Sequence, residues 1–399
     1  MEFVASQISE NIQPSATLKL NALVQEMRSQ GQDVIGLSAG EPDFDTPTHI
    51  KDAAIKALNE GKTHYTPVGG IGELKQAICK TLLRDKNLCY QNKNILVSMG
   101  AKQALYEALH VILDPGDEVL LPMPCWLSYQ EMIGMCGALV VPIPSKAENA
   151  FMPDIKDFYD RCTNKTKLII INSPNNPTGA VWNRELLNGI AEFAKEKGLY
   201  IISDEIYEKL VYDGFNHVSI AQISEDAQKR SIVISGFSKA YAMTGWRLGY
   251  IAADEKIISA INAYQSHAAG CTNSVAQYAA VAALEGTQQP LGEMLKIFNK
   301  RRDIVVNLLE KMPYISFVRP HGAFYVLIDI SKCIGKSYKG TPIHSDEDFA
   351  YLLLTHGRVS VVPGKPFGAP NNIRISYATK EDTITEAMQR LKSFLETLD

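Results

Sequence analysis

Residues 235–250 read SGFSKAYAMTGWRLGY, and the rest of the chain can be interpreted outward from this stretch. It contains the end of the short apolar run Ser231–Phe237, followed by a turn that carries one lysine, Lys239. A lysine beside apolar walls has its charged form disfavoured, so its amine becomes available as a nucleophile for Schiff-base chemistry. Arg247, eight residues later, is suited to hold a phosphate by paired hydrogen bonds. A surface lysine at a turn, followed by an arginine that closes a helix, explains the same spacing equally well.

Short apolar runs rich in β-branched residues recur on both sides of this stretch. Each run is nearly continuous rather than alternating, which is typical of strands buried on both faces by helices. The runs are NILVSMG (94–100), EVLLPMP (118–124), LVVPIP (139–144), KLIIINSP (167–174), LYIISDE (199–205), SIVISGF (231–237) and RLGYIAA (247–253). Helical periods such as Lys102–Leu113 and Asn183–Lys197 separate several of them. The pattern therefore predicts an α/β domain around a mainly parallel seven-stranded sheet, with the ligand at the strand ends.

The pattern changes near both ends of the chain. Beyond Pro313, isolated strands alternate with helices, and the expected strands are Ile315–Arg319, Ala323–Ile328, Val359–Val362 and Ile373–Tyr377. We interpret this part as a smaller α+β domain that the N-terminal residues complete. The expected division is an N-terminal arm and part of the small domain over 1–45, a large domain over 46–290 and a small C-terminal domain over 291–399.

Helices are expected at several further places. The periods predict helices over Thr17–Ser29, Thr48–Asn59 and Leu291–Lys311. The stretch Asp254–Leu284 also has a helical period, either as one long helix or with a break around Gly270.

Composition excludes several classes of protein. The 399 residues carry a net charge of −4, which gives no electrostatic reason to expect nucleic acid or an anionic membrane as a partner. No apolar run is long enough to span a membrane, and the N-terminal residues resemble neither a secretory signal nor a transit peptide. The seven cysteines are scattered without metal-ligand spacing. We therefore expect a cytoplasmic protein with reduced thiols and no metal site.

A phosphate site is predicted where the run 94–100 ends and a helix begins. The first amides of a helix are unpaired and its dipole is positive there, so a phosphate fits at this end. Gly100 and Ala101 are small enough to allow close approach, and Lys102 follows them. The N-terminus of this helix and Arg247 would contact a phosphate from two sides. The glycine alone has an ordinary explanation, because many strand–helix turns contain one.

Chemistry-bearing residues also follow other predicted strands, each with an ordinary structural alternative. Trp126 can stack on a planar ring, but tryptophan is more often a core residue. Asn176 can donate its amide to a phenolate-like oxygen, but the turn NSPNNPTG (172–179) also favours these residue types. Asp204 can stabilise a protonated pyridine nitrogen or cap a helix. Arg374 lies on a late strand, where an arginine usually faces solvent.

The stretch 235–250 resembles the lysine signature of class I pyridoxal-phosphate aminotransferases. This signature is small–x–small–Lys with an arginine eight residues later, and it is matched by Gly236, Phe237, Ser238, Lys239, Arg247, Leu248 and Gly249. Many members carry serine where this chain has Gly236, and its hydroxyl contacts the cofactor phosphate. That contact is therefore expected to be absent here or supplied by a neighbour such as Ser235. The resemblance extends from about Pro14 to the C-terminus and implies the fold type I of these enzymes.

The resemblance implies a role for each matching residue. Lys239 would bind pyridoxal 5′-phosphate as a Schiff base and transfer the proton during catalysis. The implied cofactor-binding residues are Gly100, Ala101, Lys102, Trp126, Asn176, Asp204, Tyr207, Ser238, Lys239, Arg247 and Tyr65. The implied substrate-binding residues are Gly40, Lys102, Trp126, Asn176 and Arg374. Ile206 would lie against the ring opposite Trp126, and Arg374 would bind the substrate α-carboxylate. Tyr65 would reach the cofactor phosphate of a partner, so the resemblance implies a homodimer with shared active sites.

Among class I members, the chain is most similar to the bacterial-type aspartate aminotransferases, some of which accept prephenate. In that branch Lys102 reaches the distal carboxylate of a dicarboxylic substrate, and Ser15 or Thr17 of PSAT (14–17) would contact substrate. The segment PHGAFYV (320–326) matches a family segment near the substrate, and we expect it to give structural support, with Phe324 as a wall and His321 as a bystander.

The resulting hypothesis is transfer of the amino group from aspartate to 2-oxoglutarate, giving oxaloacetate and glutamate. The alternatives are an aromatic or alanine aminotransferase, or a carbon–sulfur lyase of the same fold. A non-catalytic regulator is disfavoured, because family members of that kind carry an added DNA-binding domain and no room for one is seen before residue 14.

Overall fold

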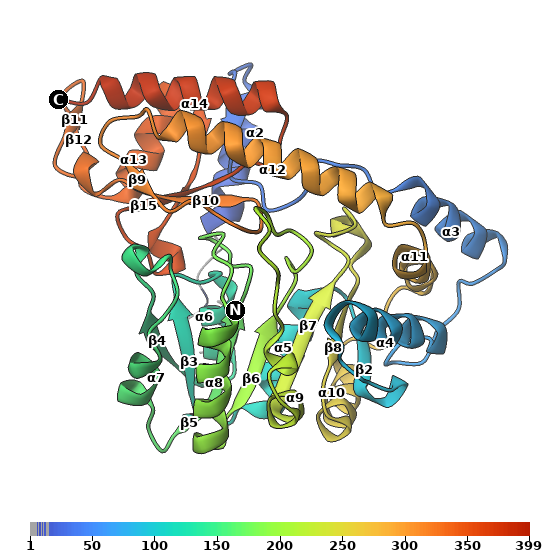
Figure 1. Ribbon diagram of the computed structural model, residues 1–399. Helices are drawn as coiled ribbons and strands as arrows, with labels where there is room; N and C mark the ends of the chain where they lie inside the picture. The colour runs from blue at the N-terminus through green and yellow to red at the C-terminus, as the bar shows by residue number, and fades with distance from the viewer. Residues whose placement is uncertain (1–5, 7, 9, 11, 13–15) are drawn as a thin grey trace, which may run out of the picture.

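The computed structural model describes residues 6, 8, 10, 12 and 16–399, and its centre is a seven-stranded sheet (Figure 1). In spatial order the strands are β2 (Ile95–Ser98), β8 (Gly249–Ala252), β7 (Ser231–Gly236), β6 (Tyr200–Asp204), β5 (Thr166–Asn172), β3 (Glu118–Met123) and β4 (Leu139–Pro144). Strand β8 is antiparallel to both of its neighbours, and the other pairings are parallel. The mainly parallel sheet expected from the apolar runs is confirmed.

Helices cover both faces of this sheet, which explains why the central residues of its strands are apolar on both sides. The helices that cover it or flank its edges are α3 (Thr48–Asn59), α4 (Gly72–Lys86), α5 (Ala101–Ile112), α6 (Ser128–Met135), α7 (Ile155–Arg161), α8 (Arg184–Lys197), α9 (Glu225–Arg230), α10 (Glu255–Ala268) and α11 (Ser274–Glu285). On β6, Ile201 packs in the core beneath α7 and α8, whereas its neighbour Ile202 packs beneath α5 and α6. Because successive strand residues point to opposite faces, neighbouring positions at the strand centre both need apolar side chains.

A smaller unit lies beyond the end of α12 (Gln289–Leu309) and contains a four-stranded antiparallel sheet. Its order is β14 (Val362–Pro363), β15 (Asn372–Ser376), β10 (Tyr325–Asp329) and β9 (Ser316–Phe317). The remaining elements of this unit are β11 (Ser337–Tyr338), β12 (Thr341–Pro342), α13 (Asp346–Leu352), β13 (Val359–Ser360) and α14 (Glu381–Glu396). Helices α12 and α14 lie side by side over this sheet (Figure 1).

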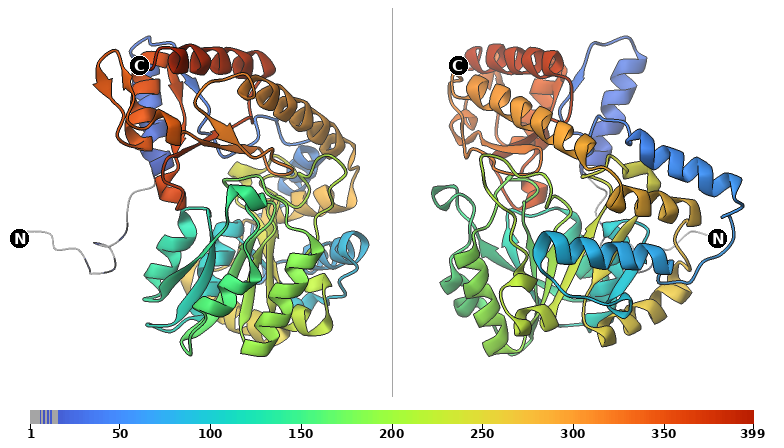
Figure 2. Two further views of the ribbon diagram at one scale, coloured as in Figure 1. Left: turned by 60° about the vertical axis from the view of Figure 1, so that its left-hand side comes forward. Right: turned by 45° about the vertical axis from the view of Figure 1, so that its right-hand side comes forward.

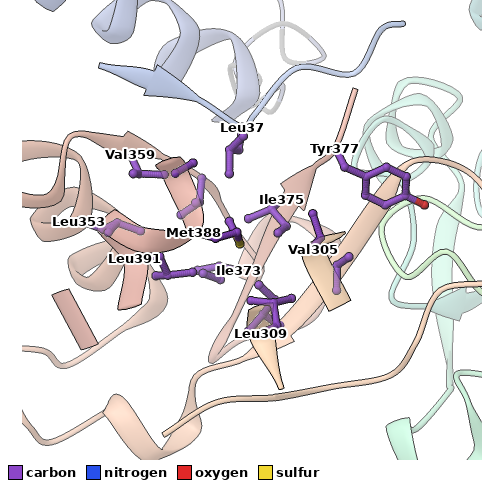
Figure 3. Close-up of a cluster of buried hydrophobic side chains, with 14 of the residues drawn as sticks. Leu37, Val305, Leu309, Leu353, Val359, Ile373, Ile375, Tyr377, Met388 and Leu391 are labelled. Carbon is purple, nitrogen blue, oxygen red and sulfur yellow. The ribbon is translucent and has the colours of Figure 1, made fainter. Parts of the chain in front are cut away.

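The N-terminal residues complete the smaller unit. Strand β1 (Ile35–Gly36) pairs in parallel with β13, and α2 (Ala16–Ser29) lies beside the C-terminal part of the chain in both views of Figure 2. Figure 3 shows Leu37 pointing into the same buried cluster as Ile375 and Leu391. The domain limits at 45 and 290 remain predictions, and α12 runs from the large sheet to the small one.

The helix boundaries follow local signals. Helix α8 begins after Asn183, whose side chain accepts the amide of Leu186, and ends at Gly198 in the left-handed conformation. The stretch 254–284 forms two helices, because Gly270 has φ +76° between the end of α10 and the start of α11. The break at Gly270 is therefore confirmed. No helix in the described part of the chain is both long and apolar enough to cross a membrane.

Candidate active site

A cavity of about 450 Å³ lies at the carboxyl ends of the parallel strands. Its lining comes from β2–α5, β3–α6, β5, β6, β7 and the smaller unit. The predicted site residues in the lining are Gly40, Ala101, Lys102, Trp126, Asn176, Asp204, Ile206, Tyr207, Ser238, Lys239, Arg247 and Arg374. The structure thus brings together residues that are up to about three hundred positions apart in the sequence.

Lys239 is half-buried in this cavity, and its Nζ donates a 2.5 Å hydrogen bond to the carbonyl oxygen of Gly40. Burial lowers the pKa of Lys239 to about 8, opposed by the carboxylate of Glu41 and reinforced by the nearby guanidinium of Arg247. Roughly a tenth of the amine is therefore unprotonated at pH 7, far more than for a lysine with the usual pKa, which favours nucleophilic chemistry.

The end of the cavity near α5 combines a helix N-terminus with a guanidinium. Gly100 precedes the helix with φ +85°, and a Cβ atom there would lie 2.6 Å from Nη2 of Arg247. A Cβ atom on Gly249 would lie 2.6 Å from the amide nitrogen of Ala101. These two glycines therefore allow β8, Arg247 and the first turn of α5 to come together. The resulting pair of positive groups can hold an anion without an acidic counter-charge.

Asp204 ends β6 and is a buried part of the cavity lining, 3% exposed. Its Oδ2 accepts a 2.6 Å hydrogen bond from the hydroxyl of Tyr129, and its Oδ1 accepts one of 3.2 Å from the amide of Ile206. Burial raises the pKa of Asp204 to about 6, against the opposing effect of the Tyr129 bond. Sequence reasoning missed Tyr129, because a tyrosine on an amphipathic helix is usually a core residue.

Asn176 and Arg374 meet across the cavity from different units. Nη1 of Arg374 donates to Oδ1 of Asn176 at 3.0 Å, and Nη2 donates to the carbonyl oxygen of Ser38 at 2.9 Å. The Nε of Arg374 is buried without a hydrogen-bond partner, and no carboxylate among the described residues forms an ion pair with this arginine. A buried, unneutralised guanidinium is a site for an incoming carboxylate. The alternative of a solvent-facing Arg374 is therefore wrong, because this side chain is 3% exposed.

Tyr207 and Tyr325 form a second pair that spans the two units. Their hydroxyl oxygens lie 2.9 Å apart, and both side chains are buried. The expectation that Phe324 forms a wall is corrected, because Tyr325 lines the cavity and Phe324 faces the core of the smaller unit. Phe324 directly precedes β10 and Tyr325 is its first residue, and these neighbouring side chains point to different sides of the chain, so only Tyr325 reaches the site.

Lys102 and Trp126 lie at the side of the cavity near the solvent. The ammonium of Lys102 lies 4.9 Å from the centre of the Trp126 ring, an arrangement that cation–π attraction stabilises. Partial burial lowers the pKa of Lys102, and Arg247 lowers it further by repulsion. No acidic side chain among the described residues forms an ion pair with Lys102, so its charge is available to a ligand.

Several predicted residues lie outside this cavity. Tyr65 is 99% exposed, and its contact with a partner remains a prediction. Ser235 does not replace the hydroxyl missing at Gly236, because its Oγ faces Glu208 at 3.3 Å on the other side of β7. His321 contacts Asp213 and stacks on Phe215 away from the cavity. Ser15 and the side chain of Thr17 lie outside the described residues.

A buried ionic cluster supports the turn after Asp204. The ammonium of Lys86 contacts the carboxylates of both Glu205 and Glu208. Glu205 also accepts hydrogen bonds from Ser203 and Ser219 at 2.9 and 2.6 Å. His217 lies beside Glu205 too, and these two carboxylates and the imidazole are close enough to bind a metal ion. The Lys86 ammonium already supplies the positive charge, so the cluster is better explained as support for the turn.

Comparison with known proteins addresses the family directly. Residues 32–391 match the family model described as aminotransferase class I and II. The chain belongs to this aminotransferase family. It is 45% identical over 394 residues to a protein of Bacillus sp. (strain YM-2) named aspartate aminotransferase, with 99% of each chain covered. It is 40% identical to the aspartate/prephenate aminotransferase of Thermus thermophilus, covering 96% of this chain and 97% of that one.

Comparison with solved structures also places the chain in the aminotransferase family. The crystal structure of the Rhizobium meliloti aspartate aminotransferase covers 100% of both chains with a TM-score of 0.96 at 38% identity. The Thermus thermophilus aspartate aminotransferase with maleate gives a TM-score of 0.93 at 38% identity, covering 99% of this chain and 100% of that one. The α/β fold with a second, smaller unit and the aminotransferase class predicted from the sequence are both confirmed.

Proposed function

We propose that this aminotransferase uses pyridoxal 5′-phosphate to transfer the amino group of aspartate to 2-oxoglutarate, giving oxaloacetate and glutamate, and that it also accepts prephenate. The observation that carries the proposal is the buried Lys239 amine, with a pKa near 8, in a cavity that also contains Asp204 and Arg247. The relatives named aspartate aminotransferase and aspartate/prephenate aminotransferase support the choice of substrates.

The cavity residues fit this cofactor in charge and in shape. Lys239 would hold it covalently, and the first turn of α5 with Arg247 would bind its phosphate, where Gly100 leaves the space that a side chain would fill. Asp204, buried without a cationic partner among the described residues, would pair with a protonated ring nitrogen. Trp126 and Ile206 would lie against the two ring faces. When bound, the cofactor supplies an electron sink that makes the α-hydrogen of the amino acid acidic.

Lys239 would move the proton that transamination requires. Once its amine is free, Nζ takes the proton from the substrate α-carbon as a general base and returns it as a general acid. A lysine with an ordinary pKa would be protonated at neutral pH and could not accept that proton. Burial and the two nearby guanidiniums keep the pKa of Lys239 in the useful range.

Arg374 and Lys102 would fix the two ends of a dicarboxylic substrate. Arg374 has a buried guanidinium with an unused Nε, and it presents a fork that suits an α-carboxylate. Lys102, at the side of the cavity near the solvent, would meet the distal carboxylate. The Thermus relative was solved with maleate, a dicarboxylate, which supports this arrangement.

The quaternary state belongs to the same proposal. We expect a homodimer in which Tyr65, 99% exposed here, reaches the cofactor phosphate of the partner subunit. We also expect the enzyme to act in the cytoplasm.

The deciding experiment is a panel of amino donors with 2-oxoglutarate, after loading with pyridoxal 5′-phosphate. Aspartate is expected to give the highest kcat/KM, and the Lys239→Ala variant is expected to lose the absorbance of the covalently attached cofactor and nearly all turnover. A matched control is Lys80→Ala, which removes an exposed lysine that pairs with Glu285. Pyruvate and ammonia released from a cysteine conjugate without an oxo acid would instead support a lyase. An aromatic or alanine donor with higher kcat/KM would overturn the choice of aspartate.

A further inference from the structure

We infer that Tyr325 is a positioning residue that links the cofactor contact of Tyr207 to the substrate-carboxylate site at Arg374. The inference rests on the proposed function, and it adds a residue of the smaller unit to the machinery of the site. Tyr325 touches both of these residues, through its hydroxyl on one side and its ring face on the other.

The hydroxyl contact is made between two buried, neutral phenols. The oxygens of Tyr207 and Tyr325 lie 2.9 Å apart, and the rings meet edge to face with centroids 5.8 Å apart. Burial raises the pKa of both hydroxyl groups, so both keep their protons across the working pH range. A neutral phenol has one proton to donate and also accepts hydrogen bonds.

The bound cofactor decides which of the two tyrosine hydroxyls donates the hydrogen bond between them. Tyr207 is the residue expected to donate to the phenolate-like oxygen of the cofactor, and it then has no proton left for Tyr325. Tyr325 must therefore donate to Tyr207, and the two bonds strengthen each other because each polarises the next. Among the described residues the Tyr325 hydroxyl forms no hydrogen bond other than the one with Tyr207, so its proton is available for this bond.

The ring contact joins Tyr325 to Arg374. The guanidinium carbon of Arg374 lies 4.4 Å from the centre of the Tyr325 ring and 5.0 Å from that of Phe367. Strand register explains the contact, because Tyr325 pairs with Ser376 and Arg374 is the diagonal neighbour two residues earlier. Both rings therefore attract the guanidinium by cation–π interaction, which limits its movement before a carboxylate arrives.

The neighbouring glycine leaves room for this arrangement. A Cβ atom on Gly40 would lie 3.3 Å from the Tyr325 hydroxyl oxygen, which is closer than most such contacts. Gly40 also accepts the hydrogen bond of Lys239 through its carbonyl oxygen. A side chain at position 40 would therefore press on the Tyr325 hydroxyl beside the catalytic lysine.

Two substitutions separate the hydroxyl from the ring. Tyr325→Phe removes the donor to Tyr207 and keeps the ring on Arg374, whereas Tyr325→Leu removes both. The matched control is Tyr377→Phe, since the Tyr377 hydroxyl is also buried but bonds to the carbonyl oxygen of Ala323 at 3.2 Å, away from the cavity. Each protein is loaded with pyridoxal 5′-phosphate and titrated with pH by visible absorbance, and then with maleate as a dicarboxylate probe.

The two readouts should move independently. In Tyr325→Phe the absorbance midpoint is expected to rise by about half a unit to one unit, because the cofactor oxygen loses part of its hydrogen bonding and binds the neighbouring proton more tightly. Maleate should bind that variant within about twofold of wild type, whereas Tyr325→Leu should show the same midpoint rise and weaken maleate by roughly five- to tenfold. Tyr377→Phe should change neither quantity.

A wild-type midpoint in Tyr325→Phe would overturn the inferred link to Tyr207, and unchanged maleate binding in Tyr325→Leu would overturn the link to Arg374. A midpoint shift in Tyr377→Phe equal to that in Tyr325→Phe would show a general effect of losing a buried hydroxyl, which also overturns the inference. Failure of the proposed function looks different, because wild-type protein would then show no cofactor absorbance to titrate.

Discussion

The hydroxyl of Tyr129 donates a 2.6 Å hydrogen bond to the carboxylate of Asp204, and both side chains are buried. Tyr129 comes from α6 and Asp204 from the end of β6, so the pair joins a helix to the sheet under the cavity. A buried carboxylate that accepts hydrogen bonds only from neutral donors is suited to bind a cation. Its ionised form costs free energy until a positive group lies beside it.

In the cofactor-free protein, the cost of ionising Asp204 should make the free energy of unfolding depend on pH. Burial raises the pKa of Asp204 from its usual 3.8 to about 6. A raised carboxyl pKa stabilises the folded state at low pH, and this stability is lost as pH rises through the folded value. Between about pH 5 and about pH 8, the wild type should lose about 1 kcal/mol of unfolding free energy relative to Asp204→Asn, which does not titrate. Urea unfolding of both proteins at several pH values measures the difference.

The cofactor supplies the internal control for that measurement. A bound pyridinium nitrogen would favour the ionised carboxylate, so loading should remove the loss of stability in the wild type. Equal pH dependence of the wild type and Asp204→Asn without cofactor would contradict the raised pKa.

A second prediction concerns the charge on Lys239. Its amine must be unprotonated to attack the cofactor carbonyl, so the rate of pyridoxal phosphate uptake by the cofactor-free enzyme should rise with pH and level off above about 8. The Glu41 carboxylate raises the pKa of Lys239 against the larger effect of burial. Glu41→Gln should therefore move the midpoint of the uptake rate to lower pH. Stopped-flow absorbance measures the rate.

The control for this experiment is Glu60→Gln, which removes an exposed carboxylate after α3. It should leave the midpoint unchanged. A midpoint that stays in place in Glu41→Gln would mean that the carboxylate is too well solvated to act on Lys239. Glu41 accepts a 2.7 Å hydrogen bond from Thr244, which holds it beside the cavity and argues against that result.

A third prediction tests the distal-carboxylate site. Lys102→Ala should raise the KM for aspartate about tenfold, because a charge-assisted hydrogen bond to the substrate is lost, and should change the KM for an aromatic donor much less. Lys102→Arg keeps the positive charge and should recover most of the aspartate affinity. Steady-state kinetics with both donors gives the ratio. Equal increases for the two donors would assign Lys102 to the cofactor phosphate instead.

The large sheet and most of the cavity could be predicted from the sequence. The central residues of strands buried on both faces are apolar, so several runs such as KLIIINSP (167–174) in series favour a buried, mainly parallel sheet. The ends of parallel strands meet at one edge, which brings Asn176, Asp204 and Lys239 together. The strand topology predicts that these three residues lie close together, whereas their roles were predicted from the resemblance to class I aminotransferases.

The residues that sequence reasoning missed depend on which way a side chain points. Tyr129 and Tyr325 each lie in an apolar segment and look like core residues until their hydroxyl partners are known. Of the two outcomes expected at Gly236, a missing hydroxyl contact or one supplied by Ser235, the second is ruled out because consecutive strand residues face opposite sides of the sheet. A Cβ atom at Gly236 itself would meet the backbone of Gly249 and Leu248 at 3.0 Å, so the chain has little space for a side chain there.

The last prediction tests how the phosphate end of the cavity is built. A Cβ atom on Gly249 would lie 2.6 Å from the amide nitrogen of Ala101 and 2.7 Å from the carbonyl carbon of Gly100. Both are backbone atoms of the turn into α5, so they cannot move aside without displacing the first turn of the helix. Gly249→Ala should therefore lower the unfolding free energy by about 1–3 kcal/mol. It should also weaken cofactor binding, because the helix amides would leave their place beside Arg247.

Gly245→Ala is the matched control, since it lies four residues earlier and a Cβ atom there meets no atom within 4 Å. Its stability should stay within about 0.5 kcal/mol of wild type. Urea unfolding and pyridoxal phosphate titration of both variants give the two quantities separately. Loss of stability with unchanged cofactor affinity in Gly249→Ala would show that the first turn of α5 does not hold the phosphate. If the close approach of β8 to α5 builds the phosphate site, Gly249→Ala should lose both stability and cofactor affinity, and Gly245→Ala should lose neither.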